Sequence, residues 1–322
     1  MAHAPIINIR NVFYYSLIVF GIPANIVTLL TIRLRNCGLA HSSTIYLIAM
    51  TTSDLLVLLF YVLVNQILSH LFPQLFYYYT LACRLNTITT AAVIDCSVWL
   101  TVSFTFDRFI SICFQSLRRS YCTPKSAALV IGVIYFVSYV RNIPYYFSNI
   151  PLQVDNNVQI GCRPNPSIDT APAWRVFYWV HVVLTPLAPY VAVALLNLLM
   201  VRHILIASQV RRGFRGDGGG SQDPEMQSRR RALVLLCTAS ASFILLWMPT
   251  VGLFLFSRIT ETYTYRSFND PFAIVNETGK MLSVLNCSTS TCMYALTQSK
   301  FRAELRAAVR KFTRLFDKLA AV

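Results

Sequence analysis

The stretch from Thr101 to Phe109, TVSFTFDRF, ends a long apolar run with an acid and an arginine side by side. Such a pair, after more than a helical turn without charged residues, has two interpretations. One is a helix that leaves a membrane at this point, and the other is a buried switch. The rest of the sequence decides between these interpretations.

The composition indicates a membrane protein. Of the 322 residues, 55% are hydrophobic and 13% are charged, and the mean hydropathy is +0.53. An ordinary soluble domain carries about 25% charged residues, and lipid accommodates so much apolar surface more readily than a water-soluble core does. The net charge of +15 is typical of nucleic-acid-binding proteins. However, the arginines flank apolar spans instead of covering a polar domain, so we expect no nucleic acid partner.

Seven apolar segments are long enough to cross a bilayer, which takes about 20 mostly apolar residues. We predict an all-α membrane protein, a seven-transmembrane helix bundle, with spans at roughly 12–33, 43–68, 82–114, 126–148, 174–206, 230–257 and 270–297. The domain order is then a short extracellular N-terminus (1–11), the seven-transmembrane domain (12–297) and a cytoplasmic tail (298–322). No cleavable signal peptide is evident, so the first span is expected to act as its own insertion signal.

Lys and Arg predict the orientation, because cytoplasmic loops carry an excess of them. With the N-terminus outside, 20 of the 28 basic residues lie on the cytoplasmic side and 8 on the outer side. We therefore expect a multi-pass plasma-membrane protein with an extracellular N-terminus and a cytoplasmic C-terminus. In the tail, basic residues alternate with apolar ones, which predicts an amphipathic helix on the membrane surface in contact with anionic lipid; its apolar positions are Phe301, Leu305, Val309, Phe312 and Phe316.

Two of the nine cysteines are predicted to form a disulfide. In this orientation Cys83, at the outer start of the third span, and Cys162, in the second outer loop, face an oxidising compartment, where disulfides persist. The other seven lie within spans, at their inner ends or in cytoplasmic loops, and are expected to stay reduced. Their spacing is not typical of zinc ligands.

The inner end of the third span carries Asp107-Arg108-Phe109, 25 residues after Cys83. This arrangement resembles the rhodopsin-like (class A) G-protein-coupled receptors, which usually have Asp-Arg-Tyr there. Further landmarks match in order: Asn25 in GIPAN, Asp54 in TTSDLL, Pro189, Phe243, Trp247 and Pro249 in FILLWMP, and Asn286 and Tyr294. The motifs VFYYSLIVFGIPAN, NIPYYF, WVH and MLSVLN are similar to a small orphan subgroup reported to respond to aromatic amino acids such as tryptophan and phenylalanine.

The resemblance implies a receptor that binds a small extracellular ligand and activates heterotrimeric G proteins. At rest Asp107 would pair with Arg108, and activation would free Arg108 to meet the C-terminal helix of the G protein. The alternative is an interfacial pair with no switch role. The residues predicted to act in coupling and activation are Asp107, Arg108, Phe109, Leu117, Phe243, Trp247, Pro249 and Tyr294.

The implied ligand pocket opens outward between the third, fifth, sixth and seventh spans. Thr90 stands where amine receptors keep an aspartate, whereas Lys280 or Arg141 can receive a carboxylate, so we expect an amino acid-like ligand or a short peptide. Alternatively, His181 is a satisfied core residue and Glu277 neutralises Lys280. The candidate pocket residues are Thr87, Thr90, Ala91, Ile94, His181, Trp247, Thr250, Phe254, Asn276 and Lys280.

Two acids lie within predicted spans, where an ionisable group is costly and by default functional. Asp54 forms a candidate allosteric sodium site with Ser97, Asn286 and Ser290, and the alternative is a protonated, water-bridged aspartate. No other cofactor is expected. Asp95 is expected to face the floor of the pocket or to pair with a neighbouring hydroxyl.

The chain departs from the family pattern in the seventh span, where the usual Asn-Pro-x-x-Tyr reads Ser290-Thr-Cys-Met-Tyr294. Near Arg108 the sixth span carries Arg229, where some relatives have an acid, so we expect appreciable basal activity. A degenerate receptor with weak signalling is one alternative. A multi-span transporter is another, although the sequence has no visible repeat. The five histidines are scattered, so we expect no enzyme.

Overall fold

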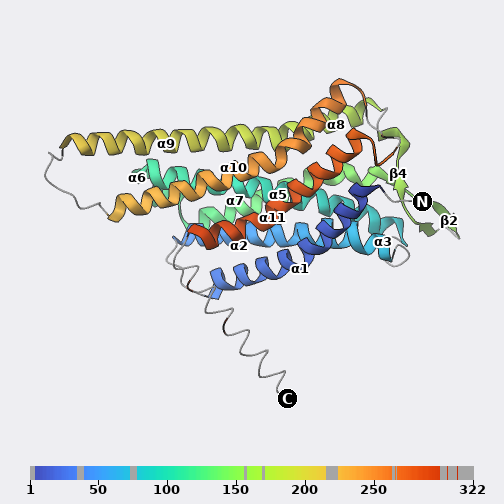
Figure 1. Cartoon of the computed structure of the whole chain (residues 1–322), viewed down its shortest axis with the longest axis horizontal. Coiled ribbons are helices and arrows are strands. Elements are labelled where there is room, and N and C mark those ends of the chain that lie inside the picture. Colours follow the sequence, from blue (N-terminus) through green and yellow to red (C-terminus); the bar gives the residue numbers. More distant parts are fainter. Residues whose placement is uncertain are drawn as a thin grey trace, which may run out of the picture.

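The computed structural model describes residues 4–34, 40–72, 78–155, 158–168, 171–214, 224–262, 265, 267–297, 303 and 310. Its long helices run side by side, and the N-terminus and the short strands lie at the same end of the bundle (Figure 1). We call this the N-terminal end. The predicted helical bundle is confirmed, and within the described ranges strands occur in a single loop region.

Seven helical segments correspond to the predicted spans. They are α1 (Pro5–Leu34); α2 (His41–Val57) with its continuations η1 (Leu58–Leu68) and α3 (Ser69–Leu71); α5 (Thr80–Cys113); α7 (Pro124–Asn142) with η2 (Ile143–Ser148); α8 (Pro172–Val182), η4 (Val183–Leu187) and α9 (Ala188–Phe214); α10 (Pro224–Ile259); and α11 (Pro271–Thr297). The first helix begins well before residue 12, so most of the predicted N-terminal segment is helical. The predicted tail helix at 298–322 lies outside the described residues, apart from positions 303 and 310.

Six of these segments are long and apolar enough to cross a membrane, among the residues described. The seventh, α11, is more polar and includes Asn276, Glu277 and Lys280. Large apolar side chains are exposed on the outside of the bundle, such as Phe20 at 74% and Phe136 at 70%. In a bilayer these side chains face lipid tails instead of water.

The core joins the first, second, third and seventh spans. Its apolar cluster includes Tyr14, Leu17, Val57, Leu58, Val62, Val93, Met281 and Val284. Asn25 links α1 to α11, because its amide nitrogen donates to the backbone oxygens of Gly21 at 2.9 Å and Cys287 at 3.1 Å. The central helix is α5, which contacts α2, α7 and α9. Residues on α5 are therefore placed to reach most of the bundle.

Two short hairpins cover the N-terminal end of α5. Strand β1 (Asn149–Ile150) pairs antiparallel with β4 (Arg163–Pro164), and β2 (Gln153–Asp155) with β3 (Val158–Ile160). The predicted disulfide between Cys83 and Cys162 is confirmed. The Thr80 hydroxyl also donates to the backbone oxygen of Gly161 at 2.6 Å. The cysteines whose side chains are described outside this disulfide are free, as predicted: Cys96, Cys113, Cys122, Cys237 and Cys287.

The fifth span is interrupted in η4. Thr185 has non-helical backbone angles, φ −150° and ψ 101°. It precedes Pro186, whose ring disfavours the helical conformation of the residue before it. Pro189, the proline that matches the family landmark, lies within α9 instead. The interruption leaves the Thr185 hydroxyl 2.7 Å from Nη2 of Arg141 on α7, which donates to it.

Candidate functional site

Asp107 and Arg108 form the predicted ion pair at the end of α5 remote from the disulfide. Nε of Arg108 donates to Oδ2 of Asp107 at 3.2 Å, and Nη2 donates to the same oxygen. Asp107 is buried, and the guanidinium of Arg108 lies 5.7 Å from the centre of the Phe104 ring. The side chain of Arg229, and with it the expectation about basal activity, lies outside the described residues.

Aromatic rings that neighbour this pair in the sequence connect the end of α5 to the short helix α6 (Gln115–Tyr121). Phe109 packs edge-on against Phe114 at 5.5 Å between ring centroids, and Phe106 packs the same way against Tyr121. Leu117 projects from α6 with half of its surface exposed. An exposed apolar side chain is the kind of anchor on which a partner helix can dock.

Neutral groups complete the surroundings of Asp107. The thiol of Cys122 donates to the backbone oxygen of Asp107 at 3.5 Å. Burial raises the pKa of Cys122 to about 11, and the Asp107 carboxylate adds to this shift. Burial likewise raises the pKa of Tyr121. Both groups are therefore neutral near pH 7, which leaves Arg108 to balance the carboxylate.

The sixth-span residues lie in the middle of the bundle. Phe243 is buried on α10 and packs edge-on against Tyr190 of α9 at 5.4 Å between centroids. Trp247 lies one turn further on, 6.1 Å from Phe243. Pro249 is inside α10 and lacks a backbone N–H there, so it weakens the helix at that point. Tyr294 belongs to α11, but its side chain lies outside the described residues.

One cavity of about 260 Å³ brings together half of the predicted pocket residues. Its lining includes Thr87, Thr90, Ala91 and Ile94 of α5 and His181 of α8. Three further lining residues were not predicted: Tyr61 and Asn65 of η1 and Tyr145 of η2. An asparagine inside an apolar span was the signal that could have identified Asn65, whose amide donates to the Thr90 hydroxyl at 3.0 Å.

A buried ion pair lies beside this cavity, between Asp95 of α5 and Arg141 of α7. The Asp95 side chain is 0% exposed and that of Arg141 is 16% exposed. The amide of Asn142 also donates to Oδ2 of Asp95, at 2.5 Å. Of the two expectations for Asp95, the floor of the pocket or a neighbouring hydroxyl, the second is corrected, because its partners are an arginine and an amide. Because Arg141 is engaged in this pair, it is not free to receive a ligand carboxylate unless Asp95 releases it.

Glu277 neutralises Lys280, which was the alternative to a ligand contact. Nζ of Lys280 donates to Oε1 of Glu277 at 2.9 Å, and Nη1 of Arg10 donates to Oε2 at 3.4 Å. Glu277 is buried, whereas the Lys280 side chain is 40% exposed. Lys280 does not line the 260 Å³ cavity. The carboxylate of Glu277 therefore joins the ends of α1 and α11.

The remaining predicted pocket residues lie elsewhere. Trp247 lines a second, smaller cavity of about 20 Å³, which it shares with Ile94. Thr250 packs closely against Gly279 of α11, where a Cβ would lie 3.1 Å from the Thr250 backbone nitrogen. Phe254 packs against Trp179 at 6.2 Å between centroids. Asn276 lines neither of these two cavities.

Three of the four candidate sodium ligands lie near one another. The Ser97 hydroxyl donates to Oδ1 of buried Asp54 at 2.7 Å. Ser97 and Asn286 both line the 20 Å³ cavity, which is large enough for one water molecule or a small ion. The side chain of Ser290 lies outside the described residues. These oxygen atoms fit a hard cation, and they equally fit a water-bridged protonated carboxyl group.

Comparison with known proteins identifies the family. Residues 24–293 match the family described as 7 transmembrane receptor (rhodopsin family). The chain therefore belongs to the rhodopsin-like family of seven-transmembrane receptors. Members of this family are multi-pass membrane receptors rather than enzymes, and coupling to G proteins is implied by membership.

Three relatives show how widely this similarity extends. The chain is 24% identical over 304 residues to Probable G-protein coupled receptor 142 of Mus musculus, which is 92% of this chain and 72% of that protein. It is 21% identical to cysteinyl leukotriene receptor 1 of Cavia porcellus, over 72% of this chain and 64% of that protein. It is 26% identical to cholecystokinin receptor type A of Cavia porcellus, over 60% and 46% respectively. The last two names refer to different ligands, the first names no ligand, and none of the three names an aromatic amino acid.

Proposed function

We propose that this receptor stands in the plasma membrane with its N-terminus outside, binds a small ligand in the 260 Å³ cavity and signals through Arg108. The main support for this proposal is that five of the pocket residues predicted from the sequence line one cavity. Thr90 in the cavity and Arg108 are 18 residues apart on α5. At 1.5 Å per residue this is about 27 Å, so the bundle itself must transmit the response.

The lining of the cavity favours a ligand the size of an amino acid or a short peptide. Drug-sized ligands occupy pockets of about 300–1,000 Å³, and this cavity is slightly smaller. Tyr61 and Tyr145 offer aromatic surface, while Asn65, Thr90 and His181 offer neutral hydrogen-bonding groups. Together with the motifs shared with the orphan subgroup, this lining supports an aromatic amino acid such as tryptophan or phenylalanine.

His181 is the residue on which we expect the ligand's polar group to bind. Its Nδ1 is buried and has no hydrogen-bond partner among the described residues. Its ring packs edge-on against Tyr145 at 5.7 Å between centroids, which fixes its orientation. A buried polar atom without a partner is costly, so a ligand that satisfies it gains affinity.

Binding of tritiated tryptophan and phenylalanine to receptor-containing membranes tests this assignment. His181→Ala is expected to weaken binding about tenfold or more, since one buried hydrogen bond is lost. Thr52→Ala is the matched control, because the Thr52 hydroxyl bonds the backbone of its own helix at Ile48 and does not line the cavity. Equal affinity in His181→Ala and the parent would exclude the proposed contact. Binding of short peptides alone would exclude an amino acid ligand.

Ligand-stimulated nucleotide exchange on a panel of G proteins tests whether the receptor signals through Arg108. Arg108→Ala is expected to abolish exchange while ligand binding is kept, because the cation lies far from the cavity. An absence of stimulated exchange in the parent itself would instead favour the degenerate receptor. Exchange without ligand that is no higher than in mock membranes would remove the expectation of basal activity. Antibody access to an N-terminal tag on intact cells tests the orientation.

Asp54, Ser97 and Asn286 are proposed to hold an allosteric sodium ion. The ion would supply a positive charge that keeps Asp54 ionised within the membrane, while Ser97 orients the carboxylate through its hydrogen bond. Sodium is then expected to raise the thermal stability of the purified receptor relative to choline at equal ionic strength. Asp54→Asn is expected to remove this difference. The same stability in both salts would favour the protonated aspartate.

A further inference from the structure

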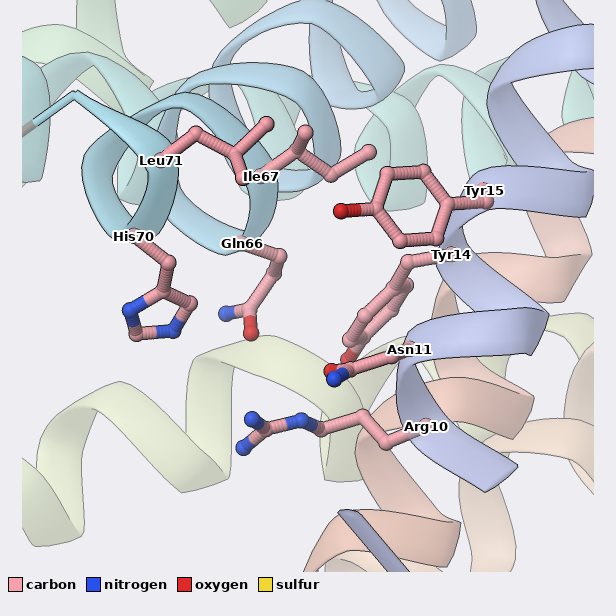
Figure 2. Close-up of a pocket in the computed structure, with 8 residues that line it drawn as sticks. All are labelled: Arg10, Asn11, Tyr14, Tyr15, Gln66, Ile67, His70 and Leu71. Carbon is pink, nitrogen blue, oxygen red and sulfur yellow. The ribbon is translucent and has the colours of Figure 1, made fainter. Parts of the chain in front are cut away.

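A second cleft lies at the N-terminal rim of the bundle, apart from the ligand cavity. It has a volume of about 220 Å³ and lies between α1 and the end of the second span. Arg10, Asn11, Tyr15, Gln66, Ile67 and His70 contribute to its lining. Figure 2 shows the side chains of Arg10 and Asn11 extending from α1 toward Gln66 and His70. The two cavities share no lining residue.

The chemistry of this cleft favours an anion. Among the residues that the structure describes, its lining contains Arg10 and no carboxylate. Arg10 makes one hydrogen bond among the described residues, the 3.4 Å contact of Nη1 with Glu277. Asn11, Gln66 and His70 add neutral or cationic donors around the guanidinium. A guanidinium with further donors beside it matches the oxygens of a phosphate or a carboxylate.

Glu277 does not depend on Arg10 for its own neutralisation. Lys280 holds the same carboxylate at 2.9 Å, which is shorter than the 3.4 Å contact from Arg10. An anion in the cleft can therefore share Arg10 without leaving Glu277 as an uncompensated buried charge. The cleft can therefore accept an anionic ligand even though Arg10 already forms an ion pair with Glu277.

An apolar stripe leads from the cleft along the lipid-facing side of α1. Tyr15 lines the cleft and is also exposed, as are Val12, Val19 and Phe20. Val12, Tyr15 and Val19 recur at three- and four-residue spacing, so they share one face of the helix, and Phe20 lies at the edge of that face. If the head group of a lipid binds at Arg10, its acyl chain can run along this face of α1 within the bilayer. The cleft therefore fits an amphiphile better than a free anion.

We propose that this rim cleft is a binding site for the anionic head group of a phospholipid in the adjoining leaflet. Arg10, Asn11, Gln66 and His70 contact the head group, and the Val12–Phe20 face of α1 contacts an acyl chain. Through the Arg10–Glu277 contact, the bound lipid reaches α11 and stabilises the joint between the first and seventh spans. The site is independent of the identity of the ligand in the main cavity.

The test uses the full chain in nanodiscs of phosphatidylcholine, with and without one tenth phosphatidate. Lipids retained by the receptor are counted by native mass spectrometry, and the thermal midpoint is measured in the same samples. Two cleft variants are compared with the parent: Arg10→Gln removes the charge, and Asn11→Phe fills the cleft while keeping the Arg10–Glu277 pair. Arg175→Gln is the control, since Arg175 is exposed and does not line the cleft. Inorganic phosphate is added in a separate arm.

Phosphatidate is expected to raise the midpoint of the parent and of Arg175→Gln, with retention about tenfold weaker in both cleft variants. The basic residues outside the cleft are the same in the parent and both cleft variants, so we expect them to retain phosphatidate equally, and the difference between these proteins isolates the cleft. Equal retention by the parent and both cleft variants would overturn the proposal. A full effect from inorganic phosphate alone would overturn the assignment to lipid.

Discussion

The buried ion pair between Asp95 and Arg141 predicts a large loss of stability when Arg141 alone is replaced by methionine. In this variant Asn142 still donates to Oδ2 of Asp95, but the carboxylate loses its counter-ion. Its Oδ1 already has no hydrogen-bond partner among the described residues. Removing one partner of a buried ion pair costs about 3–5 kcal/mol. Because Asp95 is fully buried, we expect Arg141→Met to fall in this range.

The reciprocal change is expected to cost less. In Asp95→Asn the amide oxygen still accepts from Arg141, and the Thr185 hydroxyl does so as well. We expect a loss of about 1–3 kcal/mol, the cost of an imperfectly paired polar group. The double variant is expected to lose less than the two single variants together, by about 1–3 kcal/mol, since residues of one network do not act independently.

Unfolding in mixed micelles measures these differences. When the other cysteines outside the disulfide are replaced by serine, the buried thiol of Cys287 becomes reactive toward a fluorescent maleimide only when the bundle opens, so its labelling reports the unfolded fraction. Arg175→Met is the control for loss of an exposed arginine. A stability of Arg141→Met within about 0.5 kcal/mol of the parent, which is the range of ordinary surface substitutions, would refute the assigned pair.

The remaining predictions concern three other parts of the bundle. Gly279→Ala is expected to cost about 1–3 kcal/mol in the same unfolding assay, because its Cβ meets the Thr250 backbone, whereas Gly132→Ala has open space and is expected to be neutral or stabilising. Cys83→Ser opens a disulfide that closes 79 residues of chain, and a loss of about 4–5 kcal/mol is expected, together with weaker ligand binding. Cys122 is expected to react slowly with iodoacetamide at pH 7.5. Its contribution to stability, present below pH 9, is lost as the pH rises toward about 11, and unchanged stability across that range would contradict its burial.

The spans could be predicted because lipid imposes a simple length and composition on each of them. The start of α1 could not, since residues 5–10 are mixed in polarity and resemble a free N-terminus. Pro5 was the usable signal, because proline is favoured at the first position of a helix. The break in the fifth span was also missed. Two prolines occur there, and the backbone angles of Thr185 show that the helix is interrupted before Pro186 and not before Pro189.

The candidate site was predictable where a single helix carries it. Thr87, Thr90, Ala91 and Ile94 lie on one face of α5, so a correct register for one of them placed the others. Thr250, Asn276 and Lys280 depend on how α10 and α11 rotate relative to α5, and sequence spacing contains no such information. The pairing of Asp95 with Arg141 and the contact of Arg10 with Glu277 could not be predicted for the same reason, because contacts between helices settle them. The Glu277–Lys280 pair lies within α11 at i,i+3 spacing, and the sequence offered it as the alternative to a ligand contact.

The interruption at Thr185 gives the proposed ligand a place to act on the bundle. His181 lies one turn before it and lines the cavity, while Arg141 holds the Thr185 hydroxyl and the Asp95 carboxylate together. A helix bends most easily where its backbone hydrogen bonds are already missing. A ligand that pulls on His181 or competes for Arg141 therefore works against the weakest point of the fifth span. Tyr190, at the start of α9, packs on Phe243, which packs on Trp247, so we expect movement at Thr185 to reach both sixth-span residues through Tyr190.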